Sequence, residues 1–323
     1  MLRASPAVSL IALVTIAAAT PPQPRQRAAA PLPRTADGHP DLQGVWLNDT
    51  ATPLERPKAF AEKAYFTPAE AREYEARYLL DRAAATVAGD SFELEVASDN
   101  DAFEPGKVLP SMRTSLVTDP PDGIVPSLTS DGQRRVRERT DRIRTHYADN
   151  PENFPNSDRC LNVGTATGPP MLPVFYNNNV QIVQTRDYML VHTEMIHDAR
   201  VIPLTRTTHL PRQVRLWTGD AVGRWDGDTL VVDTTNFTDK TAFRGTGSGL
   251  HVVERFSLSD PDTLGYSFTV DDSETFVRAW SATSAMTRTS ARVFEYACHE
   301  ANYSMLNALR GARFAEQHPP KQD

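Results

Sequence analysis

The sequence lacks several features that would assign a function directly. Beyond Thr20 it has no apolar run long enough for a transmembrane helix. It has no glycine-rich phosphate loop, no dinucleotide-binding fingerprint and no Gly-x-Ser-x-Gly nucleophile elbow. It also has no long block of one charge, and its net charge of -7 and pI near 5.7 argue against a nucleic-acid surface. We therefore expect a small-molecule substrate or ligand as the partner, and no nucleic acid.

Cysteine is also scarce, because Cys160 and Cys298 are the only two among 323 residues. In an oxidising compartment this pair is expected to form one disulfide, which fastens the segment before the β-rich region to the last strand. A cysteine nucleophile with His299 as its base is the weaker alternative. Cys298 and His299 are adjacent, and neighbours on a strand point to opposite faces.

The N-terminus has the pattern of an export signal. Arg3 supplies a positive charge, residues 7–19 form a short apolar run, and residues 17–19 fit an A-x-A cleavage site. We assign residues 1–19 to a signal peptide and the Pro- and Ala-rich residues 20–38 to a disordered linker. Residues 39–323 are then expected to form one β-rich domain, periplasmic or secreted and not stably inserted in a membrane. The alternative is an uncleaved form tethered by its N-terminus.

Three helices are expected. Thr67 as N-cap, Pro at the next position and Glu70 closing a capping box predict a helix over residues 67–85. A second helix is predicted over residues 129–147, and the tail over residues 300–314 predicts a third. The first two helices and the Pro-rich segments precede the strands, and we expect them to wrap the β-rich region.

After residue 175 the pattern alternates between apolar and polar residues and is interrupted by turns, which is typical of antiparallel strands. The predicted strands are Asn179–Gln184, Tyr188–Pro203, Gln213–Thr218, Val222–Trp225, Thr229–Asn236, Leu250–Leu258, Thr263–Val270, Phe276–Ser284 and Arg292–Cys298. Asp226-Gly227 predicts a tight hairpin turn. Eight or nine strands suit an antiparallel β-barrel, and the alternative is a two-sheet β-sandwich.

An earlier strand at Leu42–Leu47 contains Gly44-x-Trp46. A Gly-x-Trp near the start of an antiparallel meander resembles the opening of lipocalin-like barrels. The resemblance implies a Trp that plugs one end of the barrel under a late Arg, and a cavity for a small ligand.

Four segments are similar to a large group of exported bacterial proteins of uncharacterised function. They are residues 39–46 (HPDLQGVW), 52–57 (TPLERP), 223–237 (GRWDGDTLVVDTTNF) and 296–303 (YACHEANY). The resemblance covers most of the chain and implies export, but it implies no reaction.

The first candidate site is a row of charged residues in the predicted strand Tyr188–Pro203. With a period of two, His192, Glu194, Asp198 and Arg200 are expected to share one face. A carboxylate beside an imidazole raises the pKa of the imidazole and fixes its tautomer, so His192 is a candidate general base or acid. The alternative is a solvent-facing ladder of ion pairs.

Two further candidates are single carboxylates among apolar neighbours. Asp233 lies in Leu-Val-Val-Asp-Thr-Thr, shortly before Asn236, and Glu254 shares a strand face with apolar residues. A carboxylate in such surroundings is either paired or has a raised pKa suited to proton transfer. The alternatives are a strand-ending role for Asn236 and a buried salt bridge for Glu254, with Arg224 or Arg278 as partner.

The last candidate is His299, which follows Cys298 and would be held rigid by the disulfide. The alternative is a metal held by His192, Glu194 and either Glu254 or His299, but the spacing in His192-x-Glu194-x-x-His197 does not match a helical metal motif. We expect no metal and no cofactor. The glycine-rich loop Gly245–Gly249 is a candidate cover for a cavity mouth.

These residues predict an exported, cofactor-independent enzyme that uses acid–base catalysis for hydrolysis, elimination or isomerisation of a small organic molecule. The predicted catalytic residues are His192, Glu194, Asp233 and Glu254, and the predicted substrate-binding residues are Asp198, Arg200, Asn236 and His299. The alternative is a lipocalin-like carrier of a small hydrophobic ligand, which predicts an apolar cavity with His192, Glu194 and Glu254 outside it.

Overall fold

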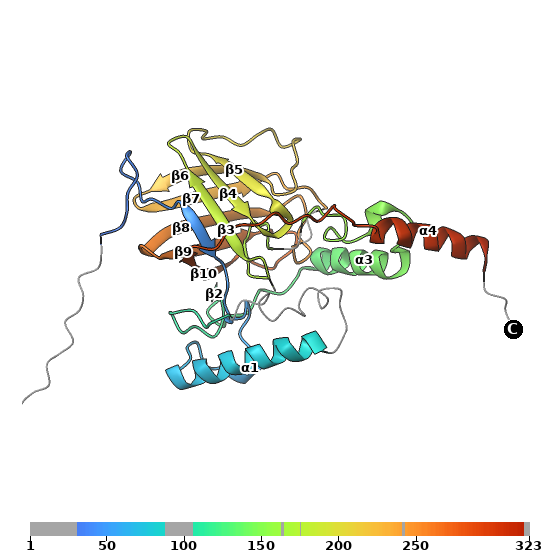
Figure 1. Cartoon of the computed structure of the whole chain (residues 1–323), viewed down its shortest axis with the longest axis horizontal. Helices are drawn as coiled ribbons and strands as arrows, with labels where there is room; N and C mark the ends of the chain where they lie inside the picture. Colours follow the sequence, from blue (N-terminus) through green and yellow to red (C-terminus); the bar gives the residue numbers. More distant parts are fainter. Residues whose placement is uncertain (1–30, 88–105, 163–164, 175, 241–242, 320–323) are drawn as a thin grey trace, which may run out of the picture. The chain divides into compact units, whose positions relative to one another are not determined.

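Ten antiparallel strands form one sheet, which Figure 1 shows with the helices of the chain. The computed structural model describes residues 31–87, 106–162, 165–174, 176–240 and 243–319. The strands are β1 (Gly44–Leu47), β2 (Val117–Asp119), β3 (Asn179–Gln184), β4 (Tyr188–Thr193), β5 (Ala199–Pro203), β6 (Asp220–Asp226), β7 (Thr229–Thr235), β8 (His251–Asp260), β9 (Thr263–Asp271) and β10 (Trp280–Thr289). Their order is β5-β4-β3-β1-β10-β9-β8-β7-β6, and β2 pairs with β10. The expectation of a mainly antiparallel β fold is confirmed.

The sheet is rolled, so that its two edges meet. β5 and β8 are six strands apart, which is roughly 29 Å in a flat sheet. Nevertheless Arg200 of β5 binds Glu254 of β8 with a 2.8 Å contact. The edge strands β5 and β6 also touch, and Gly223 of β6 faces the side chains of Ile202 and Leu204. Within the described residues these edges share no hydrogen-bonded ladder, so the sheet resembles a barrel that is not closed.

Alternation along each long strand directs one set of side chains into the rolled sheet. In β8, Val252, Glu254 and Phe256 are buried, whereas His251 and Arg255 face outward. Large side chains fill the interior: Trp46, Ile182, Met189, Ile202, Leu230, Phe256, Tyr266, Phe268, Trp280 and Met286. This cluster is the hydrophobic core of the protein.

Trp46 and Arg288 pack together beside the start of β1. Trp46 is fully buried, and its Nε1 donates to the carbonyl of Leu42 at 2.9 Å. The guanidinium of Arg288 lies 4.1 Å from the centre of the Trp46 ring. A Cβ on Gly44 would collide with this guanidinium, so the glycine of Gly-x-Trp is needed for the stack. The arrangement is the one that the Gly-x-Trp pattern implied.

In the described part of the chain, α1 (Pro68–Val87) and α3 (Ser130–His146) lie between β1 and β3, and α4 (Ser304–Gln317) follows β10. Short 3-10 helices are η1 (Lys58–Phe60), η2 (Pro151–Asn153) and η3 (Met195–His197). The predicted capping box starts α1, because Thr67 N donates to Glu70 at 2.8 Å and Glu70 N donates back to Thr67 Oγ1 at 3.3 Å. Thr129 caps α3 by accepting from Gly132 N at 3.1 Å. Each predicted helix is therefore present near its predicted position.

Several predicted boundaries are wrong. The single strand Tyr188–Pro203 is two strands, β4 and β5, separated by η3. Gln213–Thr218 and Arg292–Cys298 form no strands, and the strand predicted at Phe276 begins at Trp280. Proposed signal residues 1–19 and linker residues 20–30 lie outside the described residues. Linker residues 31–38, in contrast, are held in place by an ion pair of 2.7 Å between Arg34 and Asp228.

Candidate ligand-binding site

A cleft of about 530 Å³ lies where β1 and β7 end and β3 and β8 begin, and we name it the mouth cleft. It is lined by Thr50–Leu54, Tyr74, Tyr78, Leu116, Thr165, Leu172–Val174, Phe243 and Arg244. Most of these side chains are aliphatic or aromatic. The walls come from five separate parts of the chain, so the cleft exists only in the folded protein.

The wall formed by residues 50–54 is held by hydrogen bonds that use its polar atoms. Thr50 Oγ1 donates to the carbonyl of Lys107 at 2.7 Å, and Thr52 Oγ1 accepts from Leu109 N at 3.0 Å. The backbone of the same segment accepts from Leu116 N at 2.8 Å through the carbonyl of Pro53. The wall is therefore preformed, and the hydroxyls of Thr50 and Thr52 are already hydrogen-bonded within the protein.

The segment before β3 forms the floor of the cleft and plugs the sheet. Leu172 lines the cleft, while its neighbour Met171 is fully buried. The backbone N–H of Met171 donates to the hydroxyl of Tyr266 at 2.8 Å, in the interior of the rolled sheet. Met171 thus reaches the interior of the rolled sheet, while the next residue, Leu172, forms part of the cleft wall.

Glu254 is at the centre of a buried polar cluster. Its carboxylate accepts from Arg200 Nη1 at 2.8 Å and Nη2 at 3.0 Å, and from the Tyr266 hydroxyl at 2.8 Å. Burial, followed by the charge of Glu254, raises the pKa of Tyr266 well above its usual value, so its hydroxyl remains a donor. The salt bridge foreseen as the alternative for Glu254 is present, with Arg200 as its partner rather than Arg224 or Arg278. No lining residue of the mouth cleft belongs to this cluster.

The shared face predicted for His192, Glu194, Asp198 and Arg200 is wrong. The backbone turns at η3, where Ile196 and His197 have φ of 62° and 59°. The turn shifts the alternation by one residue, so that Arg200 points inward whereas His192 points outward. His192 and Glu254 therefore lie on opposite faces of the sheet, and the predicted proton exchange between them has no geometric support.

The other members of that row have separate partners. Glu194 is buried and accepts from Asn179 Nδ2 at 2.7 Å and from the backbone N of Phe294 at 3.1 Å. The His192 ring packs edge-on against His197, with centroids 4.4 Å apart. Burial, and then the proximity of His197, lowers the pKa of His192. Asp198 accepts from the backbone N of the residue that follows it, at 2.8 Å. These contacts hold the turn and the C-terminal segment together.

Asp233 belongs to a chain of alternating carboxylates and imidazoles on the outer face of the sheet. His209 places Nδ1 3.0 Å from Asp220 and Nε2 2.9 Å from Asp233. The other oxygen of Asp233 lies 3.1 Å from His251 Nε2. Arg206 donates to Asp220 and completes the chain. His209, which the sequence pattern did not single out, links the loop after β5 to β6 and β7, and Asp233 continues the chain to His251 of β8.

The pKa values along this chain are shifted by its hydrogen bonds. The bond with Asp233 raises the pKa of His251, and the same bond lowers the pKa of Asp233. Burial tends to raise the pKa of Asp220, but hydrogen bonds from Arg206, Leu210 N and His209 more than offset it and the pKa is lowered. The bond between them therefore favours the charged forms of both Asp233 and His251, which stands at the end of the chain.

Asn236 ends β7 with a φ of 58°, and its side-chain Nδ2 donates to the carbonyl of Leu210 at 2.9 Å. His299 is exposed and precedes α4. Neither residue lines the mouth cleft. The position of Asn236 directly after β7 matches the strand-ending role that was given as its alternative.

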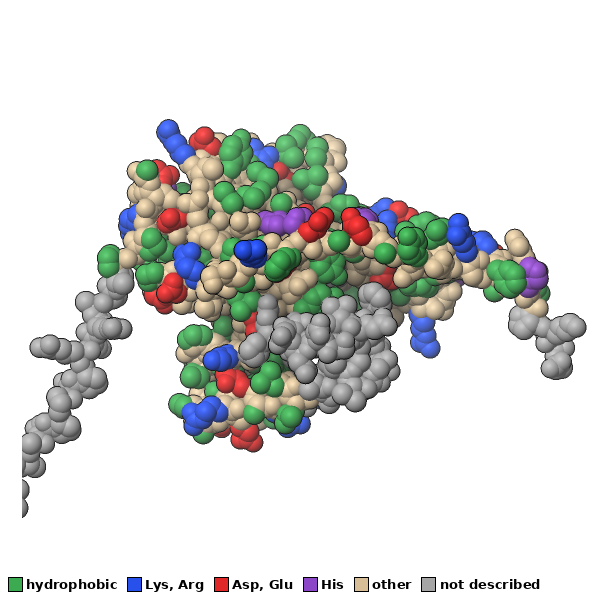
Figure 2. All heavy atoms as spheres, viewed as in Figure 1, with side chains coloured by type: hydrophobic (Ala, Val, Ile, Leu, Met, Phe, Trp, Pro, Cys, Tyr) green, Lys and Arg blue, Asp and Glu red, His purple; other side chains and the backbone are tan. Residues whose placement is uncertain are grey.

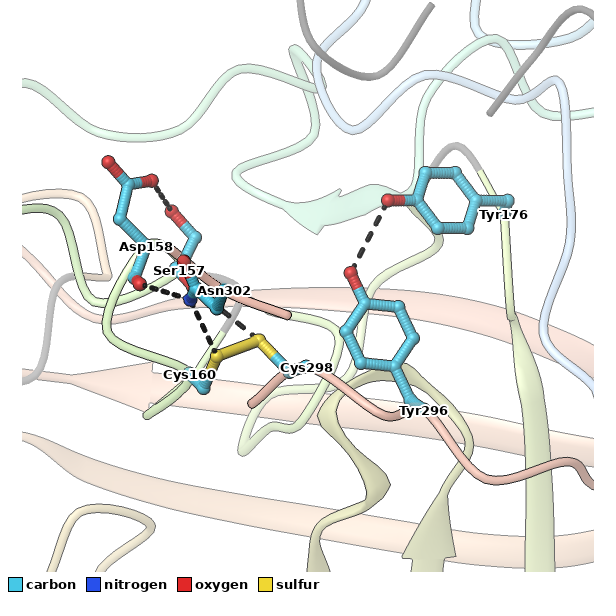
Figure 3. The surroundings of a disulfide bond; sticks show 7 residues. All are labelled: Ser157, Asp158, Cys160, Tyr176, Tyr296, Cys298 and Asn302. Carbon is cyan, nitrogen blue, oxygen red and sulfur yellow. Dashed lines mark hydrogen bonds between the residues drawn. A yellow bond between two sulfur atoms is a disulfide. The ribbon is translucent and has the colours of Figure 1, made fainter. Parts of the chain in front are cut away.

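The predicted disulfide joins Cys160 and Cys298. Figure 3 shows its surroundings, in which Asn302 Nδ2 donates to the carbonyl of Asp158 at 3.1 Å and approaches Cys160 Sγ at 3.4 Å. Cys298 lies in an irregular segment after β10, so the bridge fixes this segment rather than a strand. The predicted pairing of the two cysteines is confirmed, whereas the strand predicted around Cys298 is absent.

Most residues of the mouth cleft were not singled out from the sequence, although residues 52–54 lie in one of the four segments that resemble exported bacterial proteins. Their types are common in any core, and they are scattered over residues 50–244. One signal was present, because the glycine-rich loop Gly245–Gly249 was a candidate cover for a cavity mouth. Phe243 and Arg244, immediately before that loop, line the cleft.

Among the described residues, no group of three or more His, Cys, Asp or Glu side chains is placed to hold a metal ion. The same part of the chain contains no helix with the length and apolarity needed to cross a bilayer. On the face drawn in Figure 2, basic and acidic side chains are interspersed with apolar ones.

No protein-family model and no curated protein matches the chain. Among solved structures, a variant of the fluorescent protein UnaG is similar over 35% of this chain and 72% of its own, with 15% sequence identity and a TM-score of 0.23.

Proposed function

We propose that the protein binds one small, mainly apolar organic molecule in the mouth cleft. The cleft itself carries this proposal: its volume of about 530 Å³ is in the range of small-molecule sites, and its walls are mostly aliphatic and aromatic. Burial of apolar ligand surface provides about 25 cal/mol per Å² before the cost of association is subtracted. The hydrogen-bonded wall at residues 50–54 lowers that cost, because little ordering is needed when a ligand enters.

We place this activity outside the cytoplasm. The Cys160–Cys298 disulfide supports the placement, because such bridges form and persist in oxidising compartments. The export pattern of residues 1–19 is the second support. In this role the protein is a carrier or receptor of a ligand that reaches the cell envelope or its surroundings.

Acid–base catalysis is the second candidate function, and one observation favours it. His209 is held between Asp220 and Asp233 through both ring nitrogens, which places an imidazole within proton-transfer distance of two carboxylates. The chain lies outside the mouth cleft, so a binding role remains the leading proposal. Mass spectrometry of a ligand incubated with the protein separates the two functions. An unaltered ligand supports binding alone, and a conversion that His209→Gln abolishes supports catalysis.

The binding proposal is tested with phenylnaphthylamine, a neutral apolar dye whose fluorescence rises in apolar surroundings. Val174 lines the cleft, and Val174→Trp fills part of it. We expect the wild-type protein to bind the dye, and Val174→Trp to weaken binding by about tenfold or more, since loss of well-packed apolar contacts costs more than 1.4 kcal/mol.

Val183→Trp is the matched control, because Val183 lies on the outward face of β3 and does not line the cleft. This variant is expected to bind the dye as the wild-type protein does. Absence of dye binding by the wild-type protein, or equal binding by both variants, would contradict the proposal.

A further inference from the structure

Arg244 is the one charged residue among those that line the mouth cleft. The other lining side chains are aliphatic, aromatic, Pro or Thr. An apolar cleft with a single cation can select its ligand by charge as well as by shape. A neutral ligand leaves the guanidinium without a ligand contact, whereas an anionic group on the ligand meets an opposite charge.

The backbone fixes the position of Arg244. Its φ is 47°, a left-handed conformation, and Gly245 follows with φ of 86°. The turn is closed because Thr246 donates to the carbonyl of Phe243 from both N, at 2.8 Å, and Oγ1, at 2.7 Å. The carbonyl of Gly245 accepts from Arg135 of α3 at 3.0 Å. The guanidinium therefore projects from a well-held turn rather than from a free loop.

Glu55 accepts one of the hydrogen bonds that the guanidinium of Arg244 can donate. Arg244 Nη2 donates to Glu55 Oε2 at 2.7 Å, and Glu55 Oε1 accepts from Val125 N at 3.0 Å. The two side chains are 39% and 35% exposed, so the pair is solvated and contributes little to stability. Such a pair can be exchanged for another carboxylate at small cost. A guanidinium has five N–H donors, more than one carboxylate uses.

We infer that the ligand of the mouth cleft is an apolar molecule with one carboxylate, and that Arg244 binds this carboxylate. The inference rests on the proposed binding function and names the chemical class of its ligand. The apolar body of the ligand lies against Leu54, Leu172 and Phe243. Its carboxylate takes donors from Arg244, in competition with Glu55, since Arg and carboxylates match in charge and in planar geometry.

The experiment compares decanoate with decanol, two probes of equal chain length that differ in the charged group. Each displaces phenylnaphthylamine from the wild-type protein and from the variants. Arg244→Gln is expected to weaken decanoate binding by about tenfold or more, the contribution of a charge-assisted hydrogen bond, and to leave decanol binding unchanged. Glu55→Gln is expected to strengthen decanoate binding, because the competing carboxylate is gone, and to leave decanol binding unchanged.

Arg278→Gln is the matched control, because Arg278 also pairs with a single carboxylate, that of Asp119, at 2.8 Å and does not line the cleft. Arg278→Gln is expected to leave the binding of both decanoate and decanol unchanged. The inference is overturned, while the binding function stands, if dye and decanol bind but Arg244→Gln leaves decanoate binding unchanged. Weaker decanoate binding by Glu55→Gln would overturn it as well. If the wild-type protein binds neither dye nor probe, the binding function itself fails.

Discussion

At the scale of single residues, Arg200 and Glu254 are paired because each is enclosed. Their side chains are 4% and 0% exposed. Removing one of the two leaves a buried charge without a counter-ion, whereas removing both leaves no buried charge and only the Tyr266 hydroxyl, which still accepts from Met171 N. Arg200 Nε has no hydrogen-bond partner among the described residues, which already adds to the cost of burying the pair.

We expect Glu254→Leu to lower the free energy of unfolding by about 3–5 kcal/mol, because Arg200 then remains charged and unpaired. The double variant Arg200→Leu/Glu254→Leu is expected to recover most of that loss. Urea unfolding at equilibrium measures both. Arg255→Leu is the control, since its pair with Asp226 is exposed and is worth about 0–1 kcal/mol. A double variant as unstable as Glu254→Leu would contradict the role of the pair.

His251 provides a prediction of pH dependence. The bond with Asp233 raises the pKa of His251 above its ordinary 6.5, and Asp271 and His209 are the other titratable groups near this pair. A histidine pKa raised by folding contributes stability that is complete below the ordinary pKa and is lost as the pH rises through the folded pKa. We therefore expect the stability advantage of wild type over His251→Gln to be largest below pH 6.5 and to be lost as the pH rises through the raised pKa of His251.

The same titration can be followed directly by NMR of the His251 ring. An apparent pKa above 6.5 is expected in the wild-type protein, and Asp233→Asn is expected to bring it down. An apparent pKa of 6.5 or less in the wild-type protein would remove the basis of the prediction.

At the scale of elements, the contact between edge strands β5 and β6 depends on a position without a side chain. A Cβ on Gly223 would lie 2.6 Å from Leu204 Cδ2 and 3.0 Å from Ile202 Cγ2. Both distances are shorter than ordinary van der Waals contact. The edges therefore stay together only while Gly223 remains small.

Gly223→Ala is expected to destabilise the protein by about 1–3 kcal/mol, because the added methyl overpacks the contact between β5 and β6. Gly311→Ala is the matched control. Gly311 lies within α4 with open space around it, and alanine there is expected to stabilise by up to about 1 kcal/mol. Thermal unfolding of the two variants distinguishes them. Equal changes at both positions would show that the contact between the edges is not tight.

At the scale of the whole molecule, local sequence patterns were sufficient to predict most of the strands and helices. β3 has its predicted bounds, and the hairpin turn at Asp226-Gly227 follows from two residues whose backbone preferences are known. The Trp46–Arg288 stack was also implied by sequence. The turn at Ile196 and His197 was not, because neither residue type favours a left-handed backbone, and this turn reversed the direction of Arg200.

The candidate site was less predictable than the fold, because it depends on contacts between residues that are far apart in the sequence. Glu254 was correctly seen as unusual, but its partner Arg200 is six strands away in the sheet, and only the rolling of the sheet brings them together. Arg244 and Val174 are ordinary residues in sequence, and their importance comes from the cleft that they line. Pairings across the interior depend on the whole chain, which a local pattern does not contain.

The place of β1 in the sheet has a consequence for the order of folding. β1 is synthesised first, yet it lies between β3 and β10, so that Leu47 pairs with Asn179 on one side and with Thr287 on the other. Both pairings close long loops, which makes them slow to form. The sheet therefore cannot be completed until the end of β10 has been made, so β1 has to wait for its partner strands through most of the synthesis of the chain.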